Sequence, residues 1–160
     1  MNNIPTFKID TREIFEPALI KQTKSDFIRQ ATAKIAAGQD LLLMADNDPE
    51  TVKSTKSKGK ILGLDELTVS RLVSATLAEI TLEIVEQTNL KRLIIAGGDT
   101  SGTLCRKLGI TGNIVLQEIE PGLPSGLALG RPMLIVLKSG SFGKPDFLEK
   151  ALVHLKSLGQ

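Results

Sequence analysis

The chain has 160 residues, of which 41% are hydrophobic, which is enough for one substantial core and too few for two ordinary domains. A formal net charge of +2 is too small to indicate binding to nucleic acid or to a membrane surface. Aromatic residues make up only 3%, so the core must be aliphatic, which favours helices packed on a sheet. We therefore expect a single domain over residues 1–160.

Cys105 is the sole cysteine and His154 the sole histidine, so the composition excludes an internal disulfide and a zinc site. The N-terminal residues lack the basic and apolar regions of a secretion signal. No apolar run approaches the length that spans a membrane. A cytoplasmic protein without a membrane partner is therefore predicted.

Hydrophobic periodicity predicts the elements of the first half of the chain. Residues 4–9 alternate as a short strand does, residues 17–37 have the spacing of a helix, and the apolar run 40–46 indicates a buried strand. Residues 46–64 are polar and aperiodic, which predicts a long mobile loop. A truncated insertion, a surface excursion and a lid over a ligand are all open explanations of that loop. A long helix with a broad apolar face is predicted over residues 65–87.

In the second half, apolar runs predict strands over residues 92–96, 114–119 and 133–137, and helices over residues 100–108 and 145–158. Strands that alternate with helices indicate an α/β fold: a three-layer, open, mostly parallel sheet with helices on both faces. In such folds, ligands bind beyond the carboxyl ends of the strands. Glycine-rich turns at these ends are therefore the first candidates for a site.

The first such turn is Gly97–Gly102, with the sequence Gly-Gly-Asp-Thr-Ser-Gly, which follows the strand 92–96. The two leading glycines allow a close approach to the backbone. Asp99, Thr100 or Ser101 can cap the following helix, whose free N–H groups favour an anion such as phosphate. The alternative is an ordinary strand-to-helix turn. The turn is not a Walker A loop, because no Gly-Lys-Ser/Thr follows at the required spacing.

The second turn is Lys138–Gly143, which follows the strand 133–137 and leads to Pro145. Lys138 would place a positive charge near phosphates, and the amides around Gly140 could contact a nucleotide. On its own, this segment could also be a turn with a solvated lysine. Two such turns at the same edge of one sheet favour a shared ligand.

Residues 118–127 connect two of the predicted strands and contain two prolines and two glycines. Such a composition predicts a fixed, non-helical path. That path could wall an adenine or ribose pocket, or it could be a rigid crossover. Glu118 and Glu120 are weak metal candidates, since simple solvent exposure also explains two acids on one face of a strand.

Together, Gly97–Gly102, residues 118–124 and residues 137–143 resemble, in order and spacing, the C-terminal nucleotide-binding domain of the four-carbon acid sugar kinase family. The resemblance runs through nearly the whole chain. Ser125 and Ser141 depart from it, because an aromatic residue and an Asn are expected there. The resemblance implies that a separate N-terminal domain, missing from this chain, holds a threonate, erythronate or oxo-tetronate type of substrate.

The resemblance further implies that ATP and Mg²⁺ are the cofactors, and that the chain is part of a carbohydrate kinase that is inactive without its substrate domain. Asp99 would be a catalytic base or an indirect metal partner, and a helix cap is the alternative. No direct metal ligand is assigned, and a homo-oligomer is left open. The residues expected to bind the cofactor are Gly97, Gly98, Thr100, Ser101, Gly102, Lys138, Ser139, Gly140 and Gly143.

Two other functions are compatible with the same residues. One is a non-catalytic module that senses a nucleotide without turnover. The other is an α/β domain that binds a different phosphorylated metabolite. Competition between ATP and sugar phosphates would separate the last function from the other two.

Overall fold

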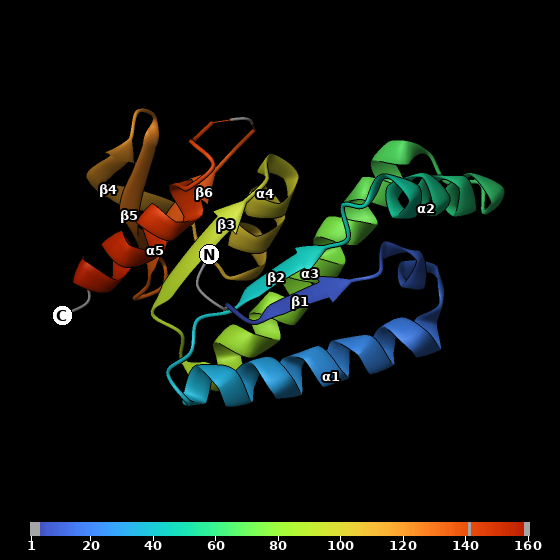
Figure 1. The fold of residues 1–160 in the computed structure, drawn as a ribbon, viewed down its shortest axis with the longest axis horizontal. Coiled ribbons are helices and arrows are strands. Elements are labelled where there is room, and N and C mark those ends of the chain that lie inside the picture. Colours follow the sequence, from blue (N-terminus) through green and yellow to red (C-terminus); the bar gives the residue numbers. More distant parts are fainter. Residues whose placement is uncertain (1–3, 141, 159–160) are drawn as a thin grey trace. The chain divides into compact units, whose positions relative to one another are not determined.

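The computed structural model describes residues 4–140 and 142–158, which form both helices and strands (Figure 1). By its internal contacts the chain divides into two units, Met1–Thr88 and Asn89–Gln160. The elements are β1 (Thr6–Ile9), the 3-10 helix η1 (Thr11–Phe15), α1 (Pro17–Ala36), β2 (Leu42–Ala45), α2 (Pro49–Ile61), α3 (Glu66–Thr88), β3 (Arg92–Ala96), α4 (Gly98–Lys107), β4 (Gly112–Glu120), β5 (Leu123–Leu129), β6 (Leu134–Lys138) and α5 (Phe147–Leu158).

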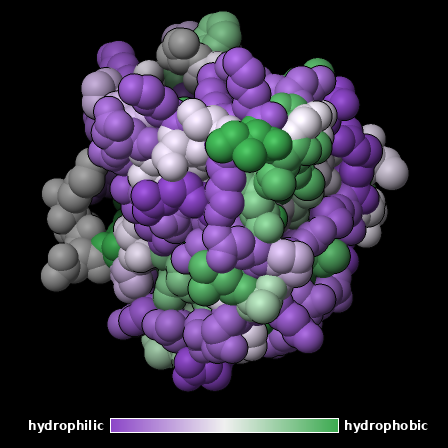
Figure 2. Space-filling view, turned by 90° about the vertical axis from the view of Figure 1, so that its right-hand side faces the viewer, coloured by the Kyte–Doolittle hydropathy of each residue, from purple (hydrophilic) through white to green (hydrophobic). Residues whose placement is uncertain are grey.

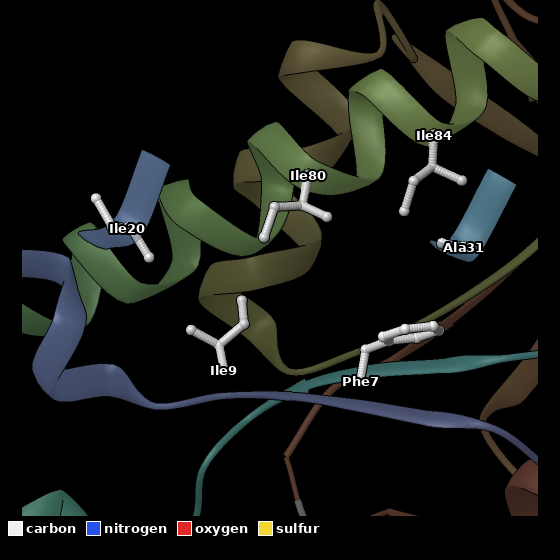
Figure 3. Packing of buried hydrophobic residues seen from close by; sticks show 6 residues of the cluster. All are labelled: Phe7, Ile9, Ile20, Ala31, Ile80 and Ile84. Atoms are coloured by element: carbon white, nitrogen blue, oxygen red, sulfur yellow. The ribbon is translucent and has the colours of Figure 1, made fainter. Parts of the chain in front are cut away.

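The first unit is built around a parallel pair of strands, β1 and β2, in which Phe7 lies opposite Leu43. Helices α1 and α3 pack together and supply most of the apolar side chains of the core. Figure 3 shows six buried members of this cluster from β1, α1 and α3, which are Phe7, Ile9, Ile20, Ala31, Ile80 and Ile84. The predicted strands and helices of this unit are therefore present, and the core is aliphatic apart from Phe7 and its ring contact with Phe27. The prediction of a buried strand over residues 40–46 is wrong in its burial, because Leu42 of β2 is exposed and the other three residues are half-buried.

Residues 46–64, expected as a mobile loop, fold mainly into the helix α2, so this expectation is wrong. The Asp48 carboxylate caps the helix by accepting the N–H groups of Glu50 and Thr51 at 3.0 and 3.3 Å. The buried stripe of α2 consists of small residues at every fourth position, Thr51, Thr55 and Gly59. A helix whose buried face is this polar and this small escapes a search for apolar periodicity.

Small residues let α2 approach its neighbours closely. A Cβ atom on Gly59 would lie 2.4 Å from Cγ2 of Val69 in α3, closer than real side chains come. The Thr55 hydroxyl lies 2.5 Å from that of Thr11 in η1. The face that carries α2 is mainly hydrophilic, with hydrophobic areas between the charged side chains (Figure 2). None of the helices in the described residues is long and apolar enough to cross a bilayer.

The second unit contains a four-stranded sheet in the order β3-β6-β5-β4. β3 and β6 are parallel, whereas β5 runs antiparallel to both β6 and β4. The α/β class is therefore confirmed, but this sheet is mixed. The difference arises because residues 118–127, considered as a crossover, instead form a β-hairpin whose turn contains Gly122 with a φ of +77°.

Helix α5 covers one face of this sheet. Phe147, Ala151 and Leu155 of α5 are buried against Leu123 and Val136 of the sheet. The neighbouring strand residues, such as Ile95 and Ile135, point to the opposite face and are also buried, and α4 packs against β3 and β6. Helices thus cover both faces of β3 and β6.

β4 is different, because it lies at the edge of the sheet and all its residues from 113 to 118 are exposed. The exposed fraction of Val115 reaches 62%. The backbone groups on the outer side of β4 have no neighbouring strand in the described sheet. Large apolar side chains exposed on β4 and β5 are Ile114, Val115, Leu116, Leu127 and Leu129.

Candidate functional site

The two glycine-rich turns meet at one edge of the sheet. β3 and β6 are parallel, with Ala96 opposite Lys138, so both strands end at the same place. The backbone N–H of Gly97 donates a hydrogen bond of 2.8 Å to the carbonyl oxygen of Lys138. The first residues of the two predicted anion-binding turns are therefore in direct contact.

Gly97 is the N-cap of α4, with φ and ψ of 109° and 128°, a conformation that residues with a Cβ rarely adopt. The helix begins at Gly98, two residues earlier than predicted. Asp99, Thr100 and Ser101 therefore lie inside the helix, and none of them occupies the N-cap. Because glycine has no side chain, the N-cap makes no side-chain hydrogen bond to the first turn.

The start of α4 has the properties of an anion site. Gly98 and Asp99 lie in the first turn, where backbone N–H groups have no intrahelical partner and the helix dipole is positive. A Cβ atom on Gly98 would meet no atom within 4 Å, so the space in front of this residue is open. Gly102 lies farther inside the helix, where its N–H belongs to the helical ladder.

Ser101 contributes an unusual hydroxyl to this turn. Its Oγ is shielded from solvent and has no hydrogen-bond partner among the described residues. Leaving a buried hydroxyl unpaired costs about 1–3 kcal/mol, so such a group is a natural partner for a ligand oxygen. The role of Ser101 in binding a ligand stays a prediction.

The second turn surrounds Lys138. The Lys138 ammonium donates to the carbonyl oxygen of Gly140 at 3.0 Å, so it is held above its own loop. Ser139 and Gly140 are exposed, and a Cβ atom on Gly140 would meet nothing within 4 Å. Gly140 and Gly143 both have positive φ, of 55° and 91°. Ser141, where the sequence departs from the family pattern, lies outside the described residues.

The two acids of β4 have structural partners. Glu118 accepts the N–H of Gly122 at 2.7 Å and closes the β4–β5 turn. Glu120 accepts the backbone N–H of Lys144 at 3.0 Å and pairs with the Lys150 ammonium at 2.9 Å. The hydrogen bond from Lys150 lowers the pKa of Glu120. These contacts explain both carboxylates without a metal ion.

Sequence reasoning missed one polar pair. The Ser125 hydroxyl, with no exposed surface, donates to the carbonyl oxygen of Gln117 at 3.0 Å and lies 2.8 Å from Nε2 of His154. Since the single hydroxyl proton is used on Gln117, His154 must donate from Nε2. The pair links β5 to α5, and a sequence separation of 29 leaves no local signal of the contact in the sequence.

Few side chains of the described site could bind a magnesium ion. The described residues contain no cluster of three or more His, Cys, Asp or Glu side chains that could hold a metal. In nucleotide sites, however, Mg²⁺ is bound mainly by phosphates, water and one or two carboxylates, which fits the exposed Asp99 in the first turn of α4.

Burial raises the pKa of the Cys105 thiol, which makes it a poor nucleophile.

Comparisons with known proteins identify the family of this chain. The family described as "Nucleotide-binding C-terminal domain" matches residues 1–148. A 3-oxo-tetronate kinase from Pseudomonas savastanoi pv. phaseolicola is 31% identical over 155 residues, which are 96% of this chain and 33% of the relative. Another from Methylobacterium radiotolerans is 36% identical over 124 residues, 76% of this chain and 28% of the relative.

A solved structure has the same fold. The crystal structure of a Haemophilus influenzae protein of the DUF1537 family is 25% identical, with a TM-score of 0.71. The match covers 95% of this chain and 35% of the Haemophilus influenzae chain. The chain spans about a third of the length of the curated relatives it matches. The match over residues 1–148 shows that this chain belongs to the family of nucleotide-binding C-terminal domains of four-carbon acid sugar kinases.

Proposed function

We propose that this chain is the ATP-binding domain of a kinase that phosphorylates a four-carbon acid sugar of the threonate, erythronate or oxo-tetronate type. The observation that carries the proposal is the hydrogen bond between Gly97 and Lys138, because it joins the two predicted anion-binding turns. The names of the relatives, which are 3-oxo-tetronate kinases, support the substrate class.

In this proposal the triphosphate lies against the amides that begin α4 and those around Gly140. Phosphoryl transfer is governed by positioning and by charge stabilisation. Lys138 can leave the Gly140 carbonyl and turn its ammonium to a phosphate oxygen, since both are oxygen acceptors within reach of a flexible side chain. When bound, Mg²⁺ would neutralise phosphate charge, and Asp99 would accept the proton of the sugar hydroxyl or orient metal-bound water.

The acceptor sugar needs a further domain. Because this chain spans about a third of its curated relatives, we propose that a separate substrate domain supplies the acceptor pocket and that the chain alone does not turn over. Residues 1–160 acting as a single domain, a cytoplasmic location and a homo-oligomer stay predictions. A non-catalytic nucleotide or phosphometabolite module remains the second candidate, favoured by the Ser101 hydroxyl and the open glycines, which suit any phosphate.

Calorimetric titration of the chain with ATP and Mg²⁺ tests the proposal. Gly98→Val places a side chain in the open space before α4 without requiring a positive φ, so it should block phosphate while the fold persists. Removing one or two charged hydrogen bonds should weaken binding roughly 10- to 100-fold. Gly140→Val should weaken it as well, although its φ of +55° also strains the loop.

Gly112→Ala is the matched control. Gly112 pairs with Leu129, at the end of the sheet away from the glycine turns, and its Cβ atom would make only ordinary contact with Leu129. ATP binding should therefore survive this change. Titrations with inorganic phosphate and a sugar phosphate distinguish a phosphometabolite module, which would bind them at least as tightly as ATP. Equal ATP affinity in the wild type, Gly98→Val and Gly140→Val would refute the site.

A further inference from the structure

Among the described residues of the loop that follows β6, hydrogen bonds hold the chain at Lys138 and at Lys144. At its start, the Lys138 carbonyl accepts the N–H of Gly97. Near its end, a Cβ atom on Gly143 would lie 3.1 Å from side-chain atoms of Leu123 and Phe147, so a larger residue would crowd the core at this point. Of the residues between these two points, Ser139, Gly140 and Phe142 are exposed.

Glu120 binds the end of this loop through a hydrogen bond. Its side chain is only 10% exposed, and its Oε2 accepts the backbone N–H of Lys144 at 3.0 Å. Its Oε1 pairs with Lys150, which also lies 3.0 Å from Asp146. The end of the loop is therefore bonded to the Glu120 carboxylate of β4, and Lys150 of α5 binds the same carboxylate.

A loop anchored in this way loses less conformational entropy when it binds a ligand, because much of the ordering has already been done by folding. We propose that Glu120 is a positioning residue that fixes the loop amides in the conformation that receives phosphate. The proposal rests on the nucleotide site described above. It assigns to Glu120 a hydrogen-bond role and no contact with the nucleotide or with metal.

Three substitutions separate the contacts of Glu120. Glu120→Ala removes both the bond to the Lys144 N–H and the ion pair. Glu120→Gln keeps a carbonyl oxygen for the Lys144 N–H but loses the charge. Lys150→Met keeps the bond to the Lys144 N–H and loses the ion pairs of Lys150 with Glu120 and Asp146. Glu118→Ala is the matched control, because Glu118 lies on the same strand and closes the turn at Gly122 instead.

The first measurement is amide hydrogen exchange of residues 139–144 without ligand. We expect faster exchange in Glu120→Ala, partial recovery in Glu120→Gln and nearly native protection in Lys150→Met and Glu118→Ala. The Lys144 amide resonance should titrate with the Glu120 carboxylate below pH 4.5, the ordinary value for Glu, because the pairing with Lys150 lowers this pKa. In Glu120→Gln, that titration should vanish.

The second measurement is the ATP dissociation constant of the same variants. Glu120→Ala should raise it about tenfold or more, with Glu120→Gln in between. A purely structural role would lower the melting temperature without producing this order of affinities. Unchanged exchange and affinity in Glu120→Ala would overturn the inference while leaving the nucleotide site intact. A wild-type chain that binds no ATP would overturn both.

Discussion

The carbonyl oxygen of Lys138 accepts the N–H of Gly97 at 2.8 Å across the parallel pair β3–β6. This bond continues the ladder one residue beyond β3, into the turn. Because the ladder extends there, the path of the chain on both sides is set by the sheet and not by flexible side chains. The start of α4 and the loop after β6 are therefore fixed with respect to each other.

Gly97→Ala and Gly98→Ala should affect different properties: the first should lower stability, and the second should weaken ATP binding. Alanine at position 97 would have to adopt a φ of 109°, which costs about 1–3 kcal/mol of stability. Alanine at position 98 meets no atom within 4 Å and should leave stability nearly unchanged while weakening ATP binding. Urea unfolding and calorimetric titration measure the two effects. Equal stability losses in both variants would contradict this assignment.

Ser101→Ala and Ser125→Ala form a second matched pair. Removing the unpaired Ser101 hydroxyl should leave stability unchanged or raise it by up to about 1 kcal/mol, while ATP affinity falls. Removing the Ser125 hydroxyl leaves the Gln117 carbonyl and the His154 N–H without their partner, at a cost of about 1–3 kcal/mol. Thermal unfolding checks both. A destabilised Ser101→Ala variant would mean that its hydroxyl has a structural partner.

Gly59→Ala should destabilise the first unit even though alanine is the better helix former by about 1 kcal/mol. The added methyl group would collide with Val69, so α2 would have to move away from α3. Val69→Ala removes the colliding atom and should recover part of the loss in the double variant. Additive effects of the two substitutions in chemical denaturation would show that the two positions do not touch.

The pH dependence of stability should reflect Asp10, whose pKa is lowered by its hydrogen bond from the Arg12 side chain. A lowered carboxyl pKa stabilises the folded state above the ordinary value of 3.8, and this contribution is lost as the pH falls through the folded value. The unfolding free energy of the wild type should therefore fall more steeply than that of Asp10→Asn below about pH 4. Parallel acid limbs in the two proteins would contradict the assignment.

Elements with a strong apolar signal were predicted well. The strand Arg92–Ala96 has the predicted bounds. α1 differs from its predicted bounds by one residue at its end, and α3 by one residue at each end. The adjacency of the two glycine turns also followed from the sequence, because parallel strands end at one edge. The roles of individual glycines in ATP binding stay predictions.

The rest depended on contacts between distant residues. α2 buries Thr51, Thr55 and Gly59, which carry no apolar signal, and its cap at Asp48 looked like one more polar loop residue. β5 contains Pro124 and Gly126, which individually disfavour a strand, and only its pairing with β4 and β6 overrides them.

In concentrated solutions of this chain, the unpaired edge of β4 can meet other protein molecules. A strand with free peptide groups and an apolar surface is a template on which a second chain can continue the sheet. The formal net charge of +2 provides little long-range repulsion to keep such encounters apart. Conditions that increase the net charge of the protein, or the substitution Val115→Lys, should therefore reduce its self-association. Neither change alters the glycine turns.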